Sequence, residues 1–393
     1  MGEAETVASV KRPTIHWVFF WFLGIASLFV WNCMLILTDY YSKRIHPNVE
    51  NYDGFFFNLG GFIAFLLMDR IGKYVSFKTL LMSVPCFQVS VFVGIYILCE
   101  FMDGGNTSPL KQGLFFFLIT LAGFSNCNMQ TNAIRYAFKF THVEVSVYNA
   151  GSGLAGIFTS SIALALAYME DESQVSRNGL VYLVFLAISL VFIMIVFMRY
   201  FASGLEEKEK SPPISADSSK PIEGMPTLYQ TYQKMNSFLW NMILVYSITL
   251  GIYPAFNFSM GLGWDHPAAF QYILLAYNLG DFLGKIIYAK FPLKDNWIPH
   301  CFSLCRVIFI FYILYAFGFE DSPAYLVGNL WITMSFTLIL SVSNGYITSC
   351  LFSLCASRLP AKHQSNSGFL MTASLYLGLA YGGLAVALGK KKN

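Results

Sequence analysis

Long runs of apolar residues alternate with polar segments along most of this 393-residue chain. A helix needs about 20 mainly apolar residues to cross a bilayer, and the first run, Ile15 to Leu37, is also longer than the apolar part of a cleaved signal peptide. The pattern predicts an all-α polytopic membrane protein with eleven transmembrane helices. Their approximate bounds are 15–38, 54–68, 77–99, 113–137, 145–168, 179–200, 236–258, 267–289, 301–318, 324–348 and 366–388.

One polar interval is much longer than the others and divides the predicted helices six plus five. It extends from about Ala202 to Lys234 and is charged and rich in Ser and Pro, a composition typical of disorder. We interpret it as a linker. The predicted organisation is an N-terminal six-helix bundle over residues 1–201, a cytoplasmic disordered loop over 202–235 and a C-terminal five-helix bundle over 236–393.

The composition agrees with a membrane protein and excludes several functions. Hydrophobic residues make up 56% and charged residues 12% of the chain, whereas soluble proteins carry about 25% charged residues. The small net charge of +3 indicates no nucleic-acid partner. The cysteines lie mostly in apolar segments and form no zinc-site pattern. The histidines are scattered and no P-loop occurs, so we predict neither an enzyme nor a cofactor.

Lys and Arg are distributed unevenly between alternate connecting segments. More of them lie on the side that carries the N-terminus and the long polar interval, and the positive-inside rule places that side in the cytoplasm. Eleven spans then place the C-terminus outside. Asn106 begins an Asn-Thr-Ser sequon in an outside segment and is therefore a glycosylation candidate.

Four amide side chains interrupt the fourth predicted span: Asn126, Asn128, Gln130 and Asn132. Lipid cannot satisfy such groups, so they must bond within a helical bundle or face water. Hydrogen bonds between helices would account for some of them. A primary amide also offers both a donor and an acceptor, the pairing that the edge of a nucleobase needs.

The eighth predicted span contains a carboxylate and an ammonium group, Asp281 and Lys285, close to Asn278. Each charge costs roughly 2.5–3.5 kcal/mol in mid-membrane even on lenient scales. At spacing i and i+4 the two charges lie on one helix face within reach of each other. The pair therefore predicts a polar path through the protein.

Two other spans contain residues that allow both a structural and a functional interpretation. Trp31 lies deep in the first span beside Asn32, and it either packs in the core or forms a flat wall for a planar ligand. Residues 151–156 read GSGLAG, which matches a dinucleotide-binding pattern, but no soluble strand precedes them. We interpret these small residues as a site of close helix packing. Tyr253-Pro254 in the seventh span predicts a kink.

The segment Asp69-Arg70-Ile71-Gly72-Lys73 is predicted to form a short cytoplasmic loop. It resembles the loop after the second helix of major-facilitator transporters. The segment is either a positively charged anchor with a Gly turn or a charged latch between helices that rock against each other. The sequence leaves both interpretations open.

Together these residues resemble the equilibrative nucleoside transporters. The resemblance covers nearly the whole chain, together with the six-plus-five pattern, and it rests on the order and spacing of several short motifs. These are Trp31-Asn32, Gln130, Gly153-Leu-Ala-Gly156, Asn278-x-x-Asp281-x-x-Gly284-Lys285, Ser343-Asn344-Gly345-Tyr346 and Gly378-Leu379.

The resemblance implies a major-facilitator-like fold that moves nucleosides down their gradient. It implies that Gln130 contacts the nucleobase, that Asp281 and Lys285 serve the ribose, and that Trp31 borders the substrate. The chain departs from the family at Lys285, where Arg is usual, because Lys lacks the planar fork of Arg. Leu28, Asn126 and Asn278 complete the predicted substrate-binding residues, and Asp69, Arg70, Gly153 and Gly156 are predicted to act in gating or packing.

We therefore expect a facilitative transporter of nucleosides, with nucleobases as further candidate substrates. It should work by alternating access as a monomer in the lipid bilayer, by default at the plasma membrane. One alternative is a proton-coupled transporter of another small polar solute, such as a sugar. A receptor or scaffold is a second alternative, although it would not need so many amides and a charge pair in mid-span.

Overall fold

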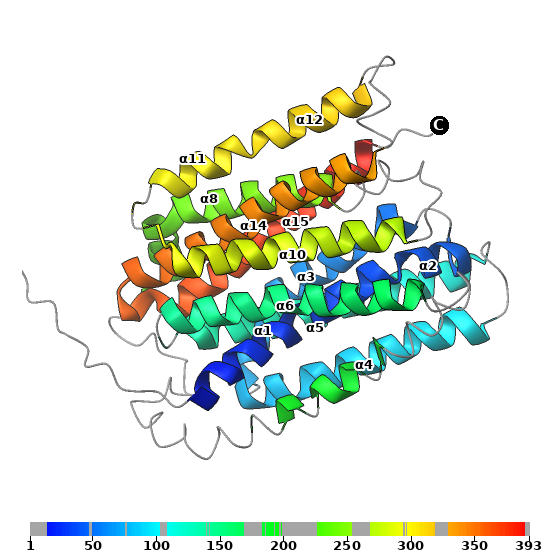
Figure 1. Ribbon diagram of the computed structural model, residues 1–393. Coiled ribbons are helices and arrows are strands. Elements are labelled where there is room, and N and C mark those ends of the chain that lie inside the picture. Colours follow the sequence, from blue (N-terminus) through cyan, green and yellow to red (C-terminus); the bar gives the residue numbers. More distant parts are fainter. Residues whose placement is uncertain are drawn as a thin grey trace, which may run out of the picture.

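The computed structural model describes most of the chain, and every regular element in the described part is a helix (Figure 1). The described residues are 14–46, 49–74, 77–102, 108–138, 140, 142–168, parts of 183–198, 226–253, 268–293, 295, 297–318 and 329–389. The helices are α1 (Thr14–Ile36), α2 (Thr38–Arg44), α3 (Val49–Tyr74), α4 (Phe77–Phe101), α5 (Pro109–Phe138), α6 (His142–Ala167), α8 (Leu228–Ile252), α10 (Ala269–Lys290), α11 (Trp297–Cys305), α12 (Val307–Gly318), α14 (Leu330–Arg358), the 3-10 helix η2 (Ala361–His363) and α15 (Gln364–Gly389).

Seven helical stretches of the described chain are long and apolar enough to cross a membrane. They lie in α1, α4, α5, α8, α14, α15 and in α11 with α12, and α3 contains a shorter apolar stretch. The protein is thus an all-α, multi-pass membrane protein. Helices α6 and α10 match predicted spans in position but are not among these seven. The predicted sixth span, 179–200, is described only as separate helical residues within 183–198.

Helix α8 begins earlier and ends earlier than predicted. Thr227 and Gln230 form a capping box, which satisfies exposed N–H groups at the helix start. Residues 228–235, predicted to lie in the disordered loop, are therefore helical. At the other end, Tyr253 is extended with φ −105° and ψ 135°, as expected for a residue that precedes proline. The predicted kink residue Pro254 lies outside the described residues.

The predicted loop at Asp69 to Lys73 is also helical, because α3 continues to Tyr74. A charged residue ends an apolar run, but it does not end a helix that continues into the lipid headgroups or water. The side chains of Asp69 and Arg70 lie outside the described part, so anchor and latch both stay open. The glycosylation candidate Asn106 lies outside it as well.

The helices form two sets that meet along the middle of the bundle. In the first set α1 packs against α6, and α3 packs against α5; in the second, α10 packs against α14, and α8 packs against α15. Contacts of α10 with α6, and of α15 with α3 and α5, join the two sets. At the end where α5 finishes, Phe138 meets Phe352 of α14 with ring centroids 6.4 Å apart. Helices α11 and α12 lie at one edge of the bundle and α4 at the opposite edge (Figure 1).

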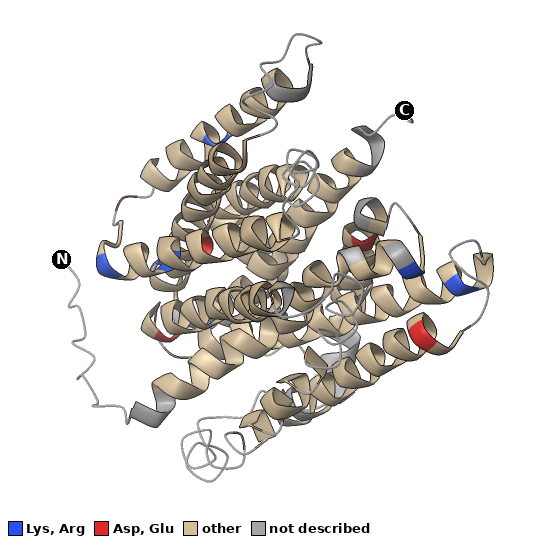
Figure 2. Ribbon diagram, turned by 45° about the vertical axis from the view of Figure 1, so that its right-hand side comes forward, with Lys and Arg blue, Asp and Glu red and all other residues tan. Residues whose placement is uncertain are grey.

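The outward surface of the helices is apolar. Leu66, Phe117, Ile308 and Phe311 are each more than half exposed, which is expected where lipid replaces water as the solvent. Figure 2 shows charged residues mainly toward the helix ends, with few in the middle of the bundle. Two of the mid-helix charges, Asp281 and Lys285, are buried and belong to the site described next.

Candidate functional site

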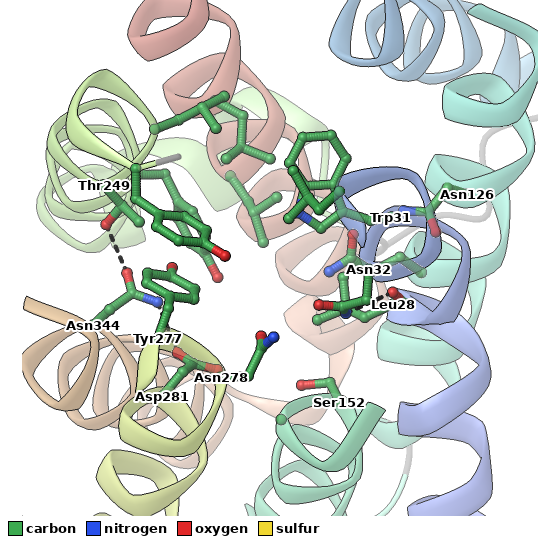
Figure 3. Close-up of a pocket in the computed structure, with 18 of the residues that line it drawn as sticks. Leu28, Trp31, Asn32, Asn126, Ser152, Thr249, Tyr277, Asn278, Asp281 and Asn344 are labelled. Atoms are coloured by element: carbon green, nitrogen blue, oxygen red, sulfur yellow. Dashed lines mark hydrogen bonds between the residues drawn. The ribbon is translucent and has the colours of Figure 1, made fainter. Parts of the chain in front are cut away.

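A cavity lies between the two sets of helices and contains about 810 Å³ of space not filled by atoms, the part open to solvent included (Figure 3). All seven residues predicted to bind substrate line it: Leu28, Trp31, Asn126, Gln130, Asn278, Asp281 and Lys285. They come from α1, α5 and α10. In Figure 3 the residues of α10 lie across the cavity from Trp31, Asn32 and Asn126.

The predicted charge pair is formed. Lys285 Nζ lies 2.7 Å from Asp281 Oδ2, and both residues are buried. Lys285 also donates to Ser152 Oγ of α6 at 2.9 Å, which links the charge pair to the first helical set. Each charge thus has a partner of opposite sign, so the pair adds no net charge to the cavity.

The second oxygen of the carboxylate is held by a different helix. Asn344 of α14 donates from Nδ2 to Asp281 Oδ1 at 2.8 Å, and Thr249 of α8 donates to Asn344 Oδ1 at 2.9 Å. Three helices therefore fix the position of Asp281. Lone pairs that these bonds leave unused are available to hydroxyl groups of a ligand.

The polar residues of α5 fall into two groups. Asn128 and Asn132 donate to carbonyl oxygens four residues back in their own helix, at 3.0 and 2.7 Å, so their NH₂ groups need no partner helix, while Asn128 Oδ1 is buried without a partner among the described residues. Asn126 instead donates across the bundle to the hydroxyl of Tyr376 on α15 at 3.0 Å. Gln130 forms no hydrogen bond within the described part of the chain, although it is only 6% exposed. Its amide is therefore free to bond a ligand in the cavity.

Asn278 gives the opposite wall a second unpaired amide. Its side chain forms no hydrogen bond with the described residues, and Figure 3 shows it pointing into the open space beside Asp281. A buried amide without a partner costs free energy. Such groups are retained where a ligand or water satisfies them.

Aromatic rings supply flat walls. Trp31 packs against Phe57 of α3 with ring centroids 4.8 Å apart. Tyr253 and Tyr277 stack face to face at 3.7 Å with an angle of 6° between the rings. Both tyrosines line the cavity, so planar surfaces are present on both sides of it.

Gly153 and Gly156 lie where α6 meets α10, as the packing interpretation predicts. A Cβ added at Gly153 would lie 3.1 Å from Phe282 Cα, and one added at Gly156 would overlap the amide of Asn278. The absence of side chains lets the two helices approach closely. The glycines thus bring Ser152 within hydrogen-bond distance of Lys285.

Many residues of the cavity are not among the predicted site residues. They include Ser152, Thr249, Asn344, Tyr277 and Tyr376. Asn344 lies in one of the motifs that carry the family resemblance, so the sequence does indicate this residue as a candidate for the site. No group of His, Cys, Asp and Glu within the described residues could hold a metal ion.

A family model described as a nucleoside transporter matches residues 202–388. Equilibrative nucleotide transporter 1 of Arabidopsis thaliana is 23% identical over 387 residues, which span 93% of this chain and 84% of that protein. Equilibrative nucleoside transporter 2 of Rattus norvegicus is 22% identical over 448 residues, which span 95% and 97% of the two chains. Over nearly its whole length, the chain is thus similar to proteins named as equilibrative nucleoside and nucleotide transporters.

Solved structures with the same fold come from the major facilitator superfamily. The proton:xylose symporter XylE has a TM-score of 0.66 and 11% identity, over 96% of this chain and 89% of that chain. The transporter FucP has a TM-score of 0.51 and 11% identity, over 97% and 98% of the two chains. At this level of identity the likeness concerns the fold alone.

Proposed function

We propose that this protein is an equilibrative nucleoside transporter, a facilitative transporter of nucleosides, and of nucleobases as further candidate substrates, by alternating access. The observation that carries the proposal is the cavity between the two helical sets. It combines unpaired amides, a charge-balanced carboxylate and flat aromatic walls. This set of groups suits a solute that is neutral overall, planar at one end and rich in hydroxyls at the other.

In the proposed complex the base lies near α5 and the sugar near α10. Gln130 bonds the base edge with its free donor and acceptor, while Trp31 flanks the ring. Asn126 acts through Tyr376, to which its amide is already bonded. Asp281 accepts hydrogen bonds from ribose hydroxyls, with Lys285 and Asn344 holding its two oxygens. Leu28 and Asn278 complete the walls.

The proposed architecture has eleven transmembrane helices arranged six plus five. The described helices that support it are α1 and α3–α6 in the first bundle, and α8, α10, α11 with α12, α14 and α15 in the second. The linker falls between them and ends before Leu228. We place the N-terminus in the cytoplasm, the C-terminus outside and the protein at the plasma membrane as a monomer, from the distribution of Lys and Arg and the family resemblance.

Transport without an energy source agrees with the absence of a P-loop in the sequence. The site groups project from two helical sets that could rock against each other. The charge pair balances itself, so a neutral substrate can enter and leave without taking a charge with it. Coupled uptake of a sugar is the alternative, and no feature of the cavity favours it.

The test is uptake by the purified protein in liposomes. Radiolabelled uridine, adenosine, hypoxanthine, adenosine monophosphate and xylose are offered with and without a pH gradient. We expect nucleoside uptake that equilibrates but does not concentrate, and that is insensitive to the gradient. Concentrative xylose uptake driven by the gradient, without nucleoside uptake, would overturn the proposal.

A further inference from the structure

Arg306 is a third charge inside the membrane region, and the site described above does not use it directly. It lies at the break between α11 and α12, within an apolar stretch, and only 1% of it is exposed. It is absent from the lining of the cavity. It contacts the cavity residue Thr249, whose hydroxyl accepts a hydrogen bond from Arg306 Nη2 at 2.7 Å.

All acceptors of this guanidinium are neutral. Arg306 Nη1 donates to Leu340 O at 3.0 Å and to Ser343 Oγ, and Nε is buried without a partner among the described residues. Because Asp281 is already paired with Lys285, Arg306 leaves one positive charge in excess among the described charges of this region. An unpaired buried cation is costly, and a neutral side chain could hold the helices together at a lower cost.

The hydrogen bonds that start at Arg306 run directly to the carboxylate of the site. A guanidinium can only donate, so Thr249 must accept from it and has its own proton left to donate. That proton is shared between Val245 O at 2.7 Å and Asn344 Oδ1 at 2.9 Å. With its oxygen facing Thr249, Asn344 presents its NH₂ group to Asp281 Oδ1 at 2.8 Å.

Without Arg306, it would no longer be fixed which groups of Thr249 and Asn344 donate and which accept. Thr249 could then turn its proton elsewhere, and the Asn344 amide could rotate to place its oxygen against the carboxylate. Two oxygens with lone pairs would repel each other, and Asp281 would leave its present position. Every link involves a residue that is at least nine-tenths buried, so water cannot easily replace the missing partner.

We propose that Arg306 is a positioning residue, which acts through Thr249 and Asn344 to fix Asp281 and thereby sets the selectivity for substrate hydroxyls. The inference rests on the proposed function, in which Asp281 binds the ribose. It assigns to α11 and α12, at the edge of the bundle, a part in substrate selection. The competing explanation is structural: Arg306 only fastens the break between α11 and α12 to α14.

The experiment compares uptake of uridine with that of 2′,3′-dideoxyuridine, which lacks the 2′ and 3′ hydroxyls of the ribose. Arg306→Gln removes the charge, Arg306→Lys keeps it, and Ser343→Ala removes one bond of Arg306 without touching Thr249. We expect Arg306→Gln to raise the KM for uridine and to reduce the preference for uridine at least tenfold. Arg306→Lys should retain part of the preference for uridine, and Ser343→Ala should keep the wild-type preference.

Two outcomes would overturn the inference. In the first, Arg306→Gln lowers uptake of both nucleosides equally with the preference unchanged, as a structural role requires. In the second, Arg306→Gln still lowers the preference in a Thr249→Val background, which would show that Arg306 does not act through Thr249, since residues of one network are non-additive.

A measurement without substrate separates this inference from the proposed function. The Tm losses of Arg306→Gln and Asp281→Asn should be less than additive in the double variant if the hydrogen-bond chain exists. Additive losses would overturn the inference even for a protein that transports no nucleoside. Failure of the wild type to take up uridine, together with non-additive Tm losses, would overturn only the proposed function.

Discussion

Gly156 of α6 lies against the side chain of Asn278 of α10, so closely that an added methyl group would overlap the amide. The contact joins the two helical sets at the cavity. Asn278 has no other partner in the described chain, so its position depends on the shape of this neighbour. Packing at Gly156 therefore determines where the amide of Asn278 lies in the cavity.

Gly156→Ala should impair binding more than folding. The amide of Asn278 would have to rotate, at a cost of about 1–3 kcal/mol for an overpacked site, and we expect the KM for a nucleoside to rise about tenfold. Kinetic uptake assays and thermal unfolding check this. Gly113→Ala on α5 is the matched control, since an added Cβ there meets no atom within 4 Å. Equal KM values for the two variants would contradict the prediction.

Gln130→Ala should change base preference without lowering stability. The amide has no hydrogen-bond partner in the described chain to lose, so Tm should stay close to that of the wild type, while the ratio of adenosine to uridine uptake changes. Asn132→Ala is the control, because it loses the bond to Asn128 O at 2.7 Å. It should lower Tm and keep the ratio. A uniform loss of uptake for Gln130→Ala would point to folding instead.

Asp281→Asn should abolish uptake and destabilise the protein, because it leaves Lys285 buried without its counter-charge. Breaking such a pair costs about 3–5 kcal/mol. The double variant Asp281→Asn/Lys285→Met removes both charges and should regain much of the Tm but none of the uptake. Recovery of uptake in the double variant would mean that the carboxylate serves only to neutralise Lys285.

His363 should make stability depend on pH. It lies in η2, and its Nδ1 is 2.9 Å from Thr231 Oγ1. Burial, with Lys234 and Lys362 nearby, holds the pKa of His363 below its ordinary value of 6.5. The unfolded chain therefore binds the proton more readily, and stability is lost as the pH falls from about 6.5 through the folded pKa.

His363→Gln should flatten this dependence. The difference in Tm between pH about 7.5 and about 5.5 should be smaller for the variant than for the wild type, because the titrating group is gone. Thermal unfolding in detergent measures it. The same difference in both proteins would show that another group is responsible.

Apolar length was enough to predict most of the helices. The bounds of α1, α4, α6 and α10 differ from the predicted spans by a few residues, since about 20 apolar residues leave little choice in a bilayer. The start of α8 carries the T-x-x-Q capping pattern at Thr227, which marks a helix start even within a polar stretch. The end of α3 was not predictable from hydropathy, which shows where the membrane ends and not where the helix ends.

The charged and amide residues of the site could be predicted because they are costly in lipid. Ser152 and Thr249 could not, because hydroxyls in apolar helices usually bond to their own backbone, as Thr159 and Thr372 do here. Only the fold reveals which hydroxyl also meets Lys285 or Arg306. Arg306 was visible as a charge within a span, but its partners come from two other helices.

Helix α10 has glycine contacts on two sides. Gly153 and Gly156 bring it against α6 of the other helical set, and Gly284 and Gly345 bring it against α14 of its own. We expect the two sets to rotate as rigid bodies about an axis near α10. Groups close to a rotation axis move the least. A solute held at Asp281 would then stay at nearly constant depth while the aqueous openings exchange around it.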